Sequence, residues 1–227
     1  MKQDNLQLKE ILRHRVFLIF ILMAVPFFFS CGNKTEMLSW KIDSINEIDG
    51  NPVTISGAPR VISTEEGDAV EFNGKSDGIL VQTNPISNWN KFQIEIDIKP
   101  YPGFPENVEQ RFLHIQDPKN ENRRILIELR LNKNHEWYGD WFIKTENESL
   151  TLVDTTQTHP LNKWSTISLQ YEEGEATGYV NGEFQVKGNI KYLSPGSEAN
   201  TSIGTRMDQR SWFKGAIKEI RFISLDE

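Results

Sequence analysis

Apolar and polar residues alternate along much of the chain beyond its N-terminal region. Segment 92–99 is the clearest case, because Phe92, Ile94, Ile96 and Ile98 are separated by single polar residues. A period of two places successive side chains on opposite faces of a strand, whereas an amphipathic helix repeats every 3.6 residues. Clusters of Gly, Pro, Asn and Asp separate the short segments, as in sandwiches and barrels. The pattern predicts an all-β, antiparallel two-sheet sandwich.

The same signals place the individual strands. We predict strands at residues 69–72, 78–81, 92–99, 111–115, 124–131, 141–144, 149–153, 164–171, 175–180, 183–186 and 215–223. Pro100 is expected to end the third strand, because proline cannot donate to the ladder. Asn181-Gly182 predicts a type I′ hairpin turn, and Asn73-Gly74 predicts a second turn. Trp164 and Phe213 are expected in the core, because large aromatic residues dominate sandwich cores.

The N-terminal region has a different pattern. Residues 1–15 are polar and carry four basic residues, residues 16–29 are almost wholly apolar, and Ser30-Cys31-Gly32 follows at once. A positive head, a short apolar run and a small-residue cleavage site are typical of a secretory signal peptide. The apolar run is shorter than the about 20 residues that a membrane-spanning helix needs.

Phe28–Cys31 resembles a bacterial lipobox, with Cys31 at the position where lipid is attached. The resemblance implies cleavage before Cys31 and a lipid anchor in the cell envelope, with the domain facing the periplasm or the cell surface. The alternative is an uncleaved anchor helix. We therefore expect a signal peptide at 1–30, the lipidated cysteine and a short tether at 31–37, and one sandwich domain at 38–227.

Charge and cysteine content narrow the classes of partner. The chain carries a net charge of −7, and the leader holds more basic than acidic residues, so the remaining domain is still more acidic. Nucleic acid is not an expected partner, because its phosphates require a basic surface. Cys31 is the only cysteine, which excludes a disulfide framework and a cysteine-based metal site.

Four segments together resemble the laminin-G-like, concanavalin A-like lectin/glucanase jelly-roll family. They are Asp68–Gly74 with Asp77–Val81, Phe92–Pro100, Trp164–Leu169 leading to Gly178–Glu183, and Ser202–Gly204 with Phe213–Phe222. The resemblance covers most of the expected domain and implies the jelly-roll fold. It does not select a function, since the family includes lectins, adhesion modules, glycoside hydrolases and polysaccharide lyases.

The predicted strand at 92–99 carries part of the carboxylate motif of the family's retaining glucanases. Retaining glucanases carry Glu-x-Asp-x-x-Glu on one strand, and Glu95 and Asp97 match its first two acids. Pro100 occupies the position of the third acid, so the acid/base group is missing there. We do not predict this mechanism, because it needs two carboxyl groups flanking the scissile bond.

A second candidate site lies on two neighbouring predicted strands. His114, Arg124, Glu128 and Arg130 occupy polar positions. If their face coincides with that of Glu95 and Asp97, one sheet surface carries two Arg, a His and several carboxylates. Arginine forks suit carboxylate or sulfate groups, and His or Glu could act as acid or base. These four residues are the catalytic candidates if the protein is an enzyme. The alternative is a solvated, mutually paired sheet face.

Aromatic residues suggest a ligand-binding site in two loops. Segment 134–142 is expected to be a loop carrying His135, Trp137, Tyr138 and Trp141. A second expected loop carries Trp212 with Arg206. Aromatic faces can stack on sugar rings, although these rings could equally fold back over the core edge.

Structural calcium, a common accessory of the family, has only one weak candidate ligand, Asp77, which could instead cap a turn. Three functions remain open. The leading one is an envelope-anchored module that binds a glycan or polysaccharide. The alternatives are a hydrolase or lyase acting on an anionic polysaccharide, and a protein-adhesion module.

Overall fold

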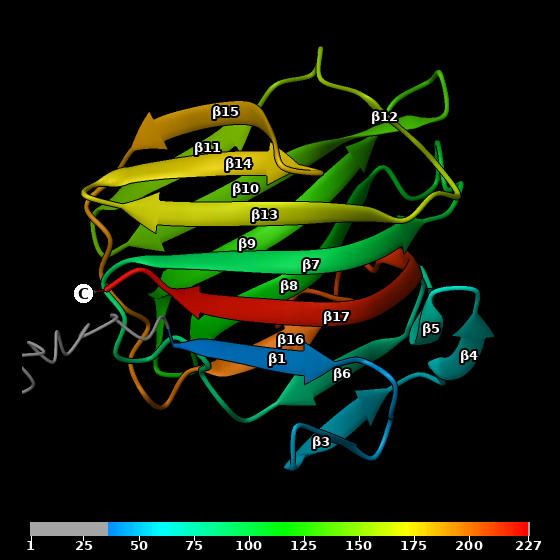
Figure 1. Cartoon of the computed structure of the whole chain (residues 1–227), viewed down its shortest axis with the longest axis horizontal. Coiled ribbons are helices and arrows are strands. Elements are labelled where there is room, and N and C mark those ends of the chain that lie inside the picture. Colours follow the sequence, from blue (N-terminus) through cyan, green and yellow to red (C-terminus); the bar gives the residue numbers. More distant parts are fainter. Residues whose placement is uncertain (1–35, 227) are drawn as a thin grey trace, which may run out of the picture. The chain divides into compact units, whose positions relative to one another are not determined.

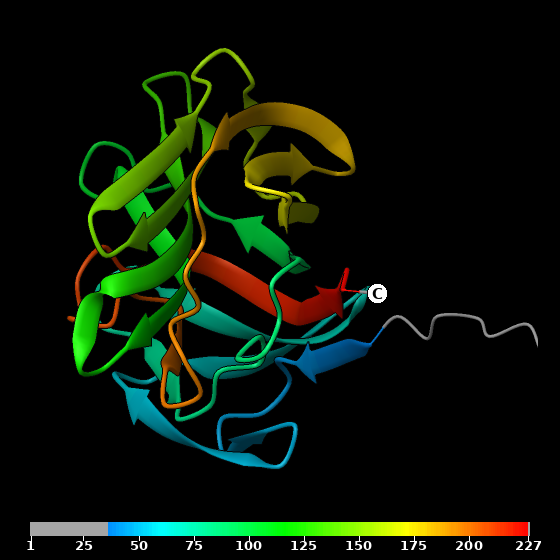
Figure 2. The same ribbon diagram turned by 90° about the vertical axis from the view of Figure 1, so that its left-hand side faces the viewer.

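The computed structural model describes residues 36–226, and every regular element in this range is a β-strand (Figure 1). The strands form two antiparallel sheets, which the edge-on view separates into two layers (Figure 2). This confirms the predicted two-sheet sandwich. Within the described range, no helix has the length and apolar character needed to cross a membrane. The predicted signal peptide and Cys31 lie outside the described residues.

The first sheet has eight strands and faces the viewer in Figure 1. In spatial order it comprises β15 (Glu183–Asn189), β14 (Glu175–Val180), β13 (Ser165–Glu172), β7 (Phe92–Pro100), β17 (Lys214–Ser224), β5 (Gly67–Asn73) and β4 (Arg60–Thr64), with β1 (Met37–Lys41) also paired to β17. The long strands β7 and β17 are central, so the sheet is built around residues from the middle and the end of the chain.

The second sheet has nine strands. In spatial order it comprises β11 (Glu148–Val153), β10 (Glu136–Thr145), β9 (Asn120–Leu131), β8 (Glu109–Asp117), β16 (Asn200–Ile203), β6 (Gly78–Val81), β3 (Asn51–Ser56) and β2 (Glu47–Ile48), with β12 (His159–Pro160) paired to β10. Hairpins connect β8 to β11 in sequence order, so four consecutive strands form one half of this sheet.

Every predicted strand overlaps an observed one. Six observed strands were not predicted from the sequence: β1, β3, β4, β16 and the two-residue strands β2 and β12. The missed strands are short, and β3 contains Pro52, which weakens a strand prediction. Pairing with longer neighbours holds these segments in place, and a single sequence does not reveal such pairing.

The two ends of the domain lie side by side. Met37 pairs with Ile223 in the β1–β17 ladder. The ring of Trp40 meets that of Phe222 edge-on, with centroids 5.0 Å apart. The first and last strands of the described residues are therefore neighbours in one sheet.

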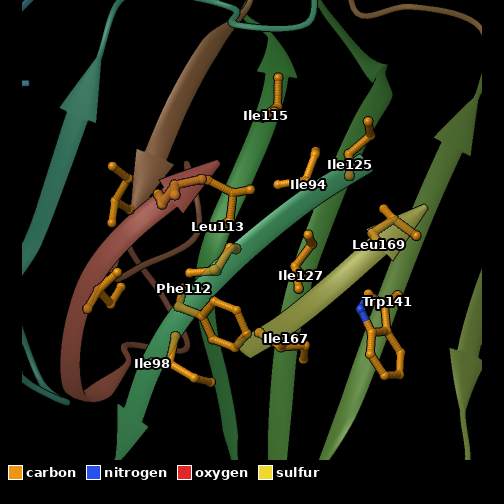
Figure 3. Close-up of a cluster of buried hydrophobic side chains, with 14 of the residues drawn as sticks. Ile94, Ile98, Phe112, Leu113, Ile115, Ile125, Ile127, Trp141, Ile167 and Leu169 are labelled. Atoms are coloured by element: carbon orange, nitrogen blue, oxygen red, sulfur yellow. The ribbon is translucent and has the colours of Figure 1, made fainter. Parts of the chain in front are cut away.

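The core confirms the predicted alternation. On β7, Phe92, Ile94, Ile96 and Ile98 are fully buried between the sheets. Figure 3 shows residues of β7 and β13 facing those of β8 and β9 across this interior. Burial of each such side chain contributes about 1.5–3 kcal/mol.

One tryptophan connects the two sheets at close range. Trp141 of β10 is only 1% exposed and lies beside Ile127, Ile167 and Leu169 in Figure 3. A methyl group added at Gly178, on β14 of the opposite sheet, would lie 2.7 Å from the indole ring. Glycine at this position therefore lets the ring rest against the backbone of the other sheet.

The Asn181-Gly182 turn has the predicted geometry. Both residues have positive φ, 53° and 78°, as a type I′ turn requires. At the other predicted turn, Gly74 has a φ of 74°, and the side-chain oxygen of Asn73 accepts hydrogen bonds from the amides of Lys75 and Ser76.

We predict that Trp141→Ala destabilises the full-length protein strongly. Truncation leaves a cavity between the sheets, and such changes cost about 3–5 kcal/mol. Urea denaturation at neutral pH measures the change in free energy of unfolding. Phe184→Ala is the matched control, because Phe184 is 53% exposed and should change that free energy by only about 0.5 kcal/mol. Equal effects of the two substitutions would contradict the interior role of Trp141.

Candidate functional site

A cavity of about 240 Å³ opens on the outer face of the nine-stranded sheet. It lies over the strands β8 to β11, beside the loop between β16 and β17. Its lining consists of Arg111, Arg124, Leu126, Glu128, Arg130, Asp140, Phe142, Thr151 and Arg206.

Strand alternation explains why these side chains face outward. On β9, Ile125, Ile127 and Leu129 are buried in the core, so Arg124, Leu126, Glu128 and Arg130 take the opposite face. On β10, inward-facing Trp141 likewise directs its neighbours Asp140 and Phe142 outward. The register places Glu128 opposite Asp140 and Leu126 opposite Phe142, which assembles the centre of the cavity.

Arg111 reaches this face because of a β-bulge. The β8–β9 register shifts between Arg111 and Leu113, so Arg111 faces the cavity while Leu113 is buried. Without the bulge, Arg111 and Leu113 would share one face. Five lining residues were not among the sequence-based candidates: Arg111, Leu126, Asp140, Phe142 and Thr151. Asp140 and Phe142 could have been found by extending the period of two through 136–145, whereas the bulge leaves no comparable signal.

Ion pairs link the acids of the cavity to two of its arginines. Nε of Arg111 lies 2.8 Å from Oε2 of Glu128, without the alignment of a hydrogen bond. Arg130 donates through Nε to Asp140 at 2.6 Å and through Nη1 to Glu109 at 2.8 Å. Burial raises the pKa of Glu128 to about 7 despite the opposing effect of Arg111, and Asp140 adds to the rise.

His114 shares the outer face but does not line the cavity. Its side chain is 0% exposed, and its Nδ1 accepts a hydrogen bond of 2.9 Å from the amide of Met207 in the covering loop. Burial, followed by the positive charges of Arg206 and Arg124, lowers the pKa of His114 to about 3. The imidazole is therefore neutral at physiological pH. Because His114 is buried and absent from the cavity lining, the structure does not bring this catalytic candidate into the site.

The predicted aromatic loop at 134–142 is wrong for most of its length. From Glu136 onward the segment is strand β10, and Trp137 and Trp141 are buried. The two tryptophans share the inward parity of the strand, and Nε1 of Trp137 donates to the carbonyl of Pro160 at 3.2 Å. They are core residues and not ligand platforms.

The other residues of that cluster remain accessible but lie apart. His135 is exposed in the turn before β10, with a φ of 59°. Tyr138 is half-buried, faces outward, and pairs with Arg130 in the ladder.

The predicted pair of Arg206 and Trp212 divides between two places. Both lie in the loop between β16 and β17, which is held by a hydrogen bond of 2.8 Å from the amide of Arg111 to the carbonyl of Ser211. Arg206 lines the cavity, whereas the half-buried ring of Trp212 lies against Gly78 on β6. Elsewhere, Phe213 is fully buried as predicted, but Trp164 is only half-buried, with the Lys218 ammonium 5.2 Å from its ring centroid.

Glu95 and Asp97 do not share the face of the cavity, so the two polar faces do not form one charged surface. They lie on β7, in the other sheet. Nε of Arg221 donates to Glu95 and its Nη1 to Asp97, each at 2.8 Å. Hydrogen bonding to Asp97 raises the pKa of Arg221. The two acids thus belong to a compensated ion-pair network.

Asp77, the weak calcium candidate, has its carboxylate occupied by protein donors. It accepts hydrogen bonds from the amides of Ala58 and Asn73, at 2.9 and 3.0 Å, and from the side chain of Asn73. Among residues 36–226, no group of three His, Cys, Asp or Glu side chains could hold a metal ion. Asp77 therefore anchors the turn after β5.

Comparisons with known proteins agree with the fold. Domain 4 of AbnA, a GH43 extracellular arabinanase from Geobacillus stearothermophilus in complex with arabinotriose, has a TM-score of 0.57 at 18% identity, over 85% of this chain and 94% of that one. The CBM40 of an IT-sialidase from Ruminococcus gnavus, bound to alpha2,3 sialyllactose, has a TM-score of 0.51 at 15% identity, over 75% and 91%.

A mutant of HCR/D is also similar, with a TM-score of 0.61 at 15% identity over 84% of this chain, which spans only 49% of that protein. At these identities the likeness establishes the fold alone. None of the curated proteins matches the chain. The family model described as the Concanavalin A-like lectin/glucanases superfamily matches residues 103–225. Since this segment is more than half of the 227 residues, the chain belongs to the concanavalin A-like lectin/glucanase superfamily.

Proposed function

We propose that this protein is a glycan-binding module held at the bacterial cell envelope by a lipid on Cys31. The observation that carries the binding part is the cavity on the outer face of β8 to β11. It combines an apolar surface from Leu126 and Phe142 with guanidinium, carboxylate and hydroxyl groups. Sugar sites have this composition, because sugar rings present both apolar faces and hydroxyl edges.

Two further points support a glycan ligand. Two structures of the same fold, those of the arabinanase domain and the sialidase module, hold an oligosaccharide. All lining residues of the cavity except Arg206 also lie on strands, so most of its side chains are positioned before a ligand arrives, which lowers the cost of binding.

The anchor rests on the leader alone. A positive segment, an apolar run and Ser30-Cys31-Gly32 are the supporting observations. A lipid anchor would place the cavity close to the membrane surface, where a retained polysaccharide would stay near the cell.

An enzyme of the same fold is the second candidate, favoured by the pair Glu128 and Asp140. Opposed residues of an antiparallel ladder have Cβ atoms about 4.5–5.5 Å apart, and retaining glycosidases need two carboxyl groups about 5–5.5 Å apart. A carboxyl group with a pKa of about 7 can donate a proton at neutral pH. Against this, Arg130 engages Asp140, and both acids are buried.

We predict that the full-length protein, in a neutral polyoxyethylene detergent, is retarded by at least one member of a polysaccharide panel in affinity electrophoresis. Phe142→Ala should weaken retention about 2- to 10-fold, because one stacking contact contributes about 0.5–1.5 kcal/mol. Phe184→Ala, on the opposite sheet, is the matched control and should leave retention unchanged. If only Phe184→Ala loses retention, the ligand binds on the other sheet. If the wild-type protein is not retarded by any polysaccharide of the panel, the protein-adhesion module is favoured instead.

The same incubations separate binding from catalysis. We expect retention without new reducing ends and without the ultraviolet absorbance of an unsaturated uronate. Either signal, if abolished by Asp140→Asn, would establish the enzyme in place of the binding module.

For the anchor, we predict that the protein incorporates radiolabelled palmitate in a bacterial host and that Cys31→Ala does not. Globomycin should cause the uncleaved precursor to accumulate. An unlabelled, uncleaved product would support the anchor helix instead.

We predict that Glu128 makes stability fall as pH rises from about 4.5 to about 7. Its folded pKa lies above its ordinary value, so the folded protein binds the proton more tightly than the unfolded chain in this window. The raised pKa of Glu128 corresponds to a change of about 3 kcal/mol in the free energy of unfolding across this pH range. Glu128→Gln should abolish that change. Urea denaturation at a series of pH values measures the difference. If the free energy of unfolding varies with pH in the same way in the wild type and in Glu128→Gln, the raised pKa of Glu128 is contradicted. Glu183→Gln, at an exposed position, is the control and should leave the pH dependence of that free energy unchanged.

A further inference from the structure

The arginines of the cavity are not equally compensated. Its lining holds four arginines but only two carboxylates. The acids are engaged by Arg111 and Arg130, which also contact Glu109 at the rim. Two guanidinium groups, Arg124 and Arg206, therefore lie in the cavity without a carboxylate of its lining beside them.

Arg124 forms no ion pair within the described part of the chain. Its Nη1 donates to the backbone carbonyl of Glu121, and its guanidinium carbon lies 5.3 Å from the ring centroid of Phe142. Its Nε is buried and has no hydrogen-bond partner among the described residues. A buried donor without a partner is unfavourable, so this site favours an incoming acceptor.

Arg206 is held only loosely by an acid. Its Nε lies 3.5 Å from Asp208, whose carboxylate also pairs with Arg210 at 2.8 Å and is half exposed. Burial lowers the pKa of Arg206; Asp208 opposes this change, while Arg210 and Arg124 add to it. Within the lining of the cavity itself, four guanidinium groups face two carboxylates, so positive charge exceeds negative charge there.

This local excess of positive charge contrasts with the chain as a whole, whose net charge is −7. Other arginines in the described residues are paired with acids, for example Arg60 with Glu71 and Arg221 with Glu95 and Asp97. Partly desolvated cations without counter-charges are unfavourable in the free protein, and a bound anion would relieve the repulsion.

The size of the cavity limits what can enter. About 240 Å³ is below the roughly 300–1,000 Å³ of sites for drug-sized ligands, so the cavity suits one charged sugar residue. Leu126 and Phe142 can contact the apolar face of such a ring. The guanidinium forks can bind the two oxygens of a carboxylate or sulfate group in parallel.

We propose that the cavity recognises an anionic substituent on a glycan, a carboxylate or a sulfate ester, through Arg124 and Arg206. This inference rests on the proposed glycan-binding function and assigns its ligand class. Glu128 is the competing internal anion on the same face. Arg111 and Arg130 hold the two buried carboxylates and are positioning residues.

The test compares matched pairs of probes that differ only in charge. The full-length protein is assayed with dextran and dextran sulfate, and with polygalacturonate and its methyl ester, at about 0.15 M salt to suppress non-specific attraction. We expect the charged member of at least one pair to bind more tightly than its neutral partner. The pair that shows the preference distinguishes sulfate from carboxylate.

Variants then assign the preference to the cavity. Arg206→Gln and Arg124→Gln should each weaken binding of the charged probe about 10- to 100-fold, the range for a hydrogen bond to a charged group. Glu128→Gln should strengthen it, a result that loss of structure alone would not produce. Arg60→Gln is the control, because it removes the same charge from the exposed edge region of the opposite sheet. Melting temperatures within a few degrees of the wild type verify the fold of each variant.

Three results would overturn the inference. Tighter binding of the neutral members would reject the anion while leaving glycan binding intact. Wild-type affinity for the charged probe in both folded arginine variants would place the charge recognition elsewhere. Absence of binding to any probe, together with no retention on the wider panel, would reject the glycan-binding function as well.

Discussion

The contact between Trp141 and the opposite sheet is the constraint on which both the core and the cavity depend. The indole rests against Gly178, so β10 cannot shift by one residue without placing a tryptophan in solvent. Because Trp141 faces inward, Asp140 and Phe142 must face outward. The β9–β10 register then sets Glu128 and Leu126 opposite them. The chemistry of the outer face thus follows from a packing requirement in the interior.

The two sheets carry similar residue types on their outer faces but use them differently. On the eight-stranded sheet, Arg221 contacts Glu95, Asp97 and Glu219 within 3.0 Å, so its charge is fully compensated. On the nine-stranded sheet, cations outnumber acids in a recess that is partly screened from water. An ion-pair network with balanced charges stabilises the surface that carries it. Cations without counter-charges can still form favourable ion pairs with a bound anion.

Much of the fold could be predicted from the sequence, because alternation in segments such as 92–99 and 124–131 directly reflects burial of one face. The site was less predictable. Only residues 141–144 of strand 136–145 were predicted as a strand, because Gly139 and Asp140 interrupt the apolar pattern before them. Gly139 is small because the Trp141 ring lies over it. The assignment of Glu95 and Arg124 to different sheets depends on long-range pairing, which local pattern does not contain.

The acidity of the chain shapes how an anionic glycan would bind. Long-range repulsion from a protein of net charge −7 slows the approach of a polyanion. Attraction must then act at short range, between the guanidinium forks and a single charged sugar that enters the cavity. Such a site discriminates by fit as well as charge, since a flexible polyanion gains nothing from the surrounding surface. An anchor would offset the slow approach, because neighbouring copies on one membrane could engage the same polymer and raise its effective concentration.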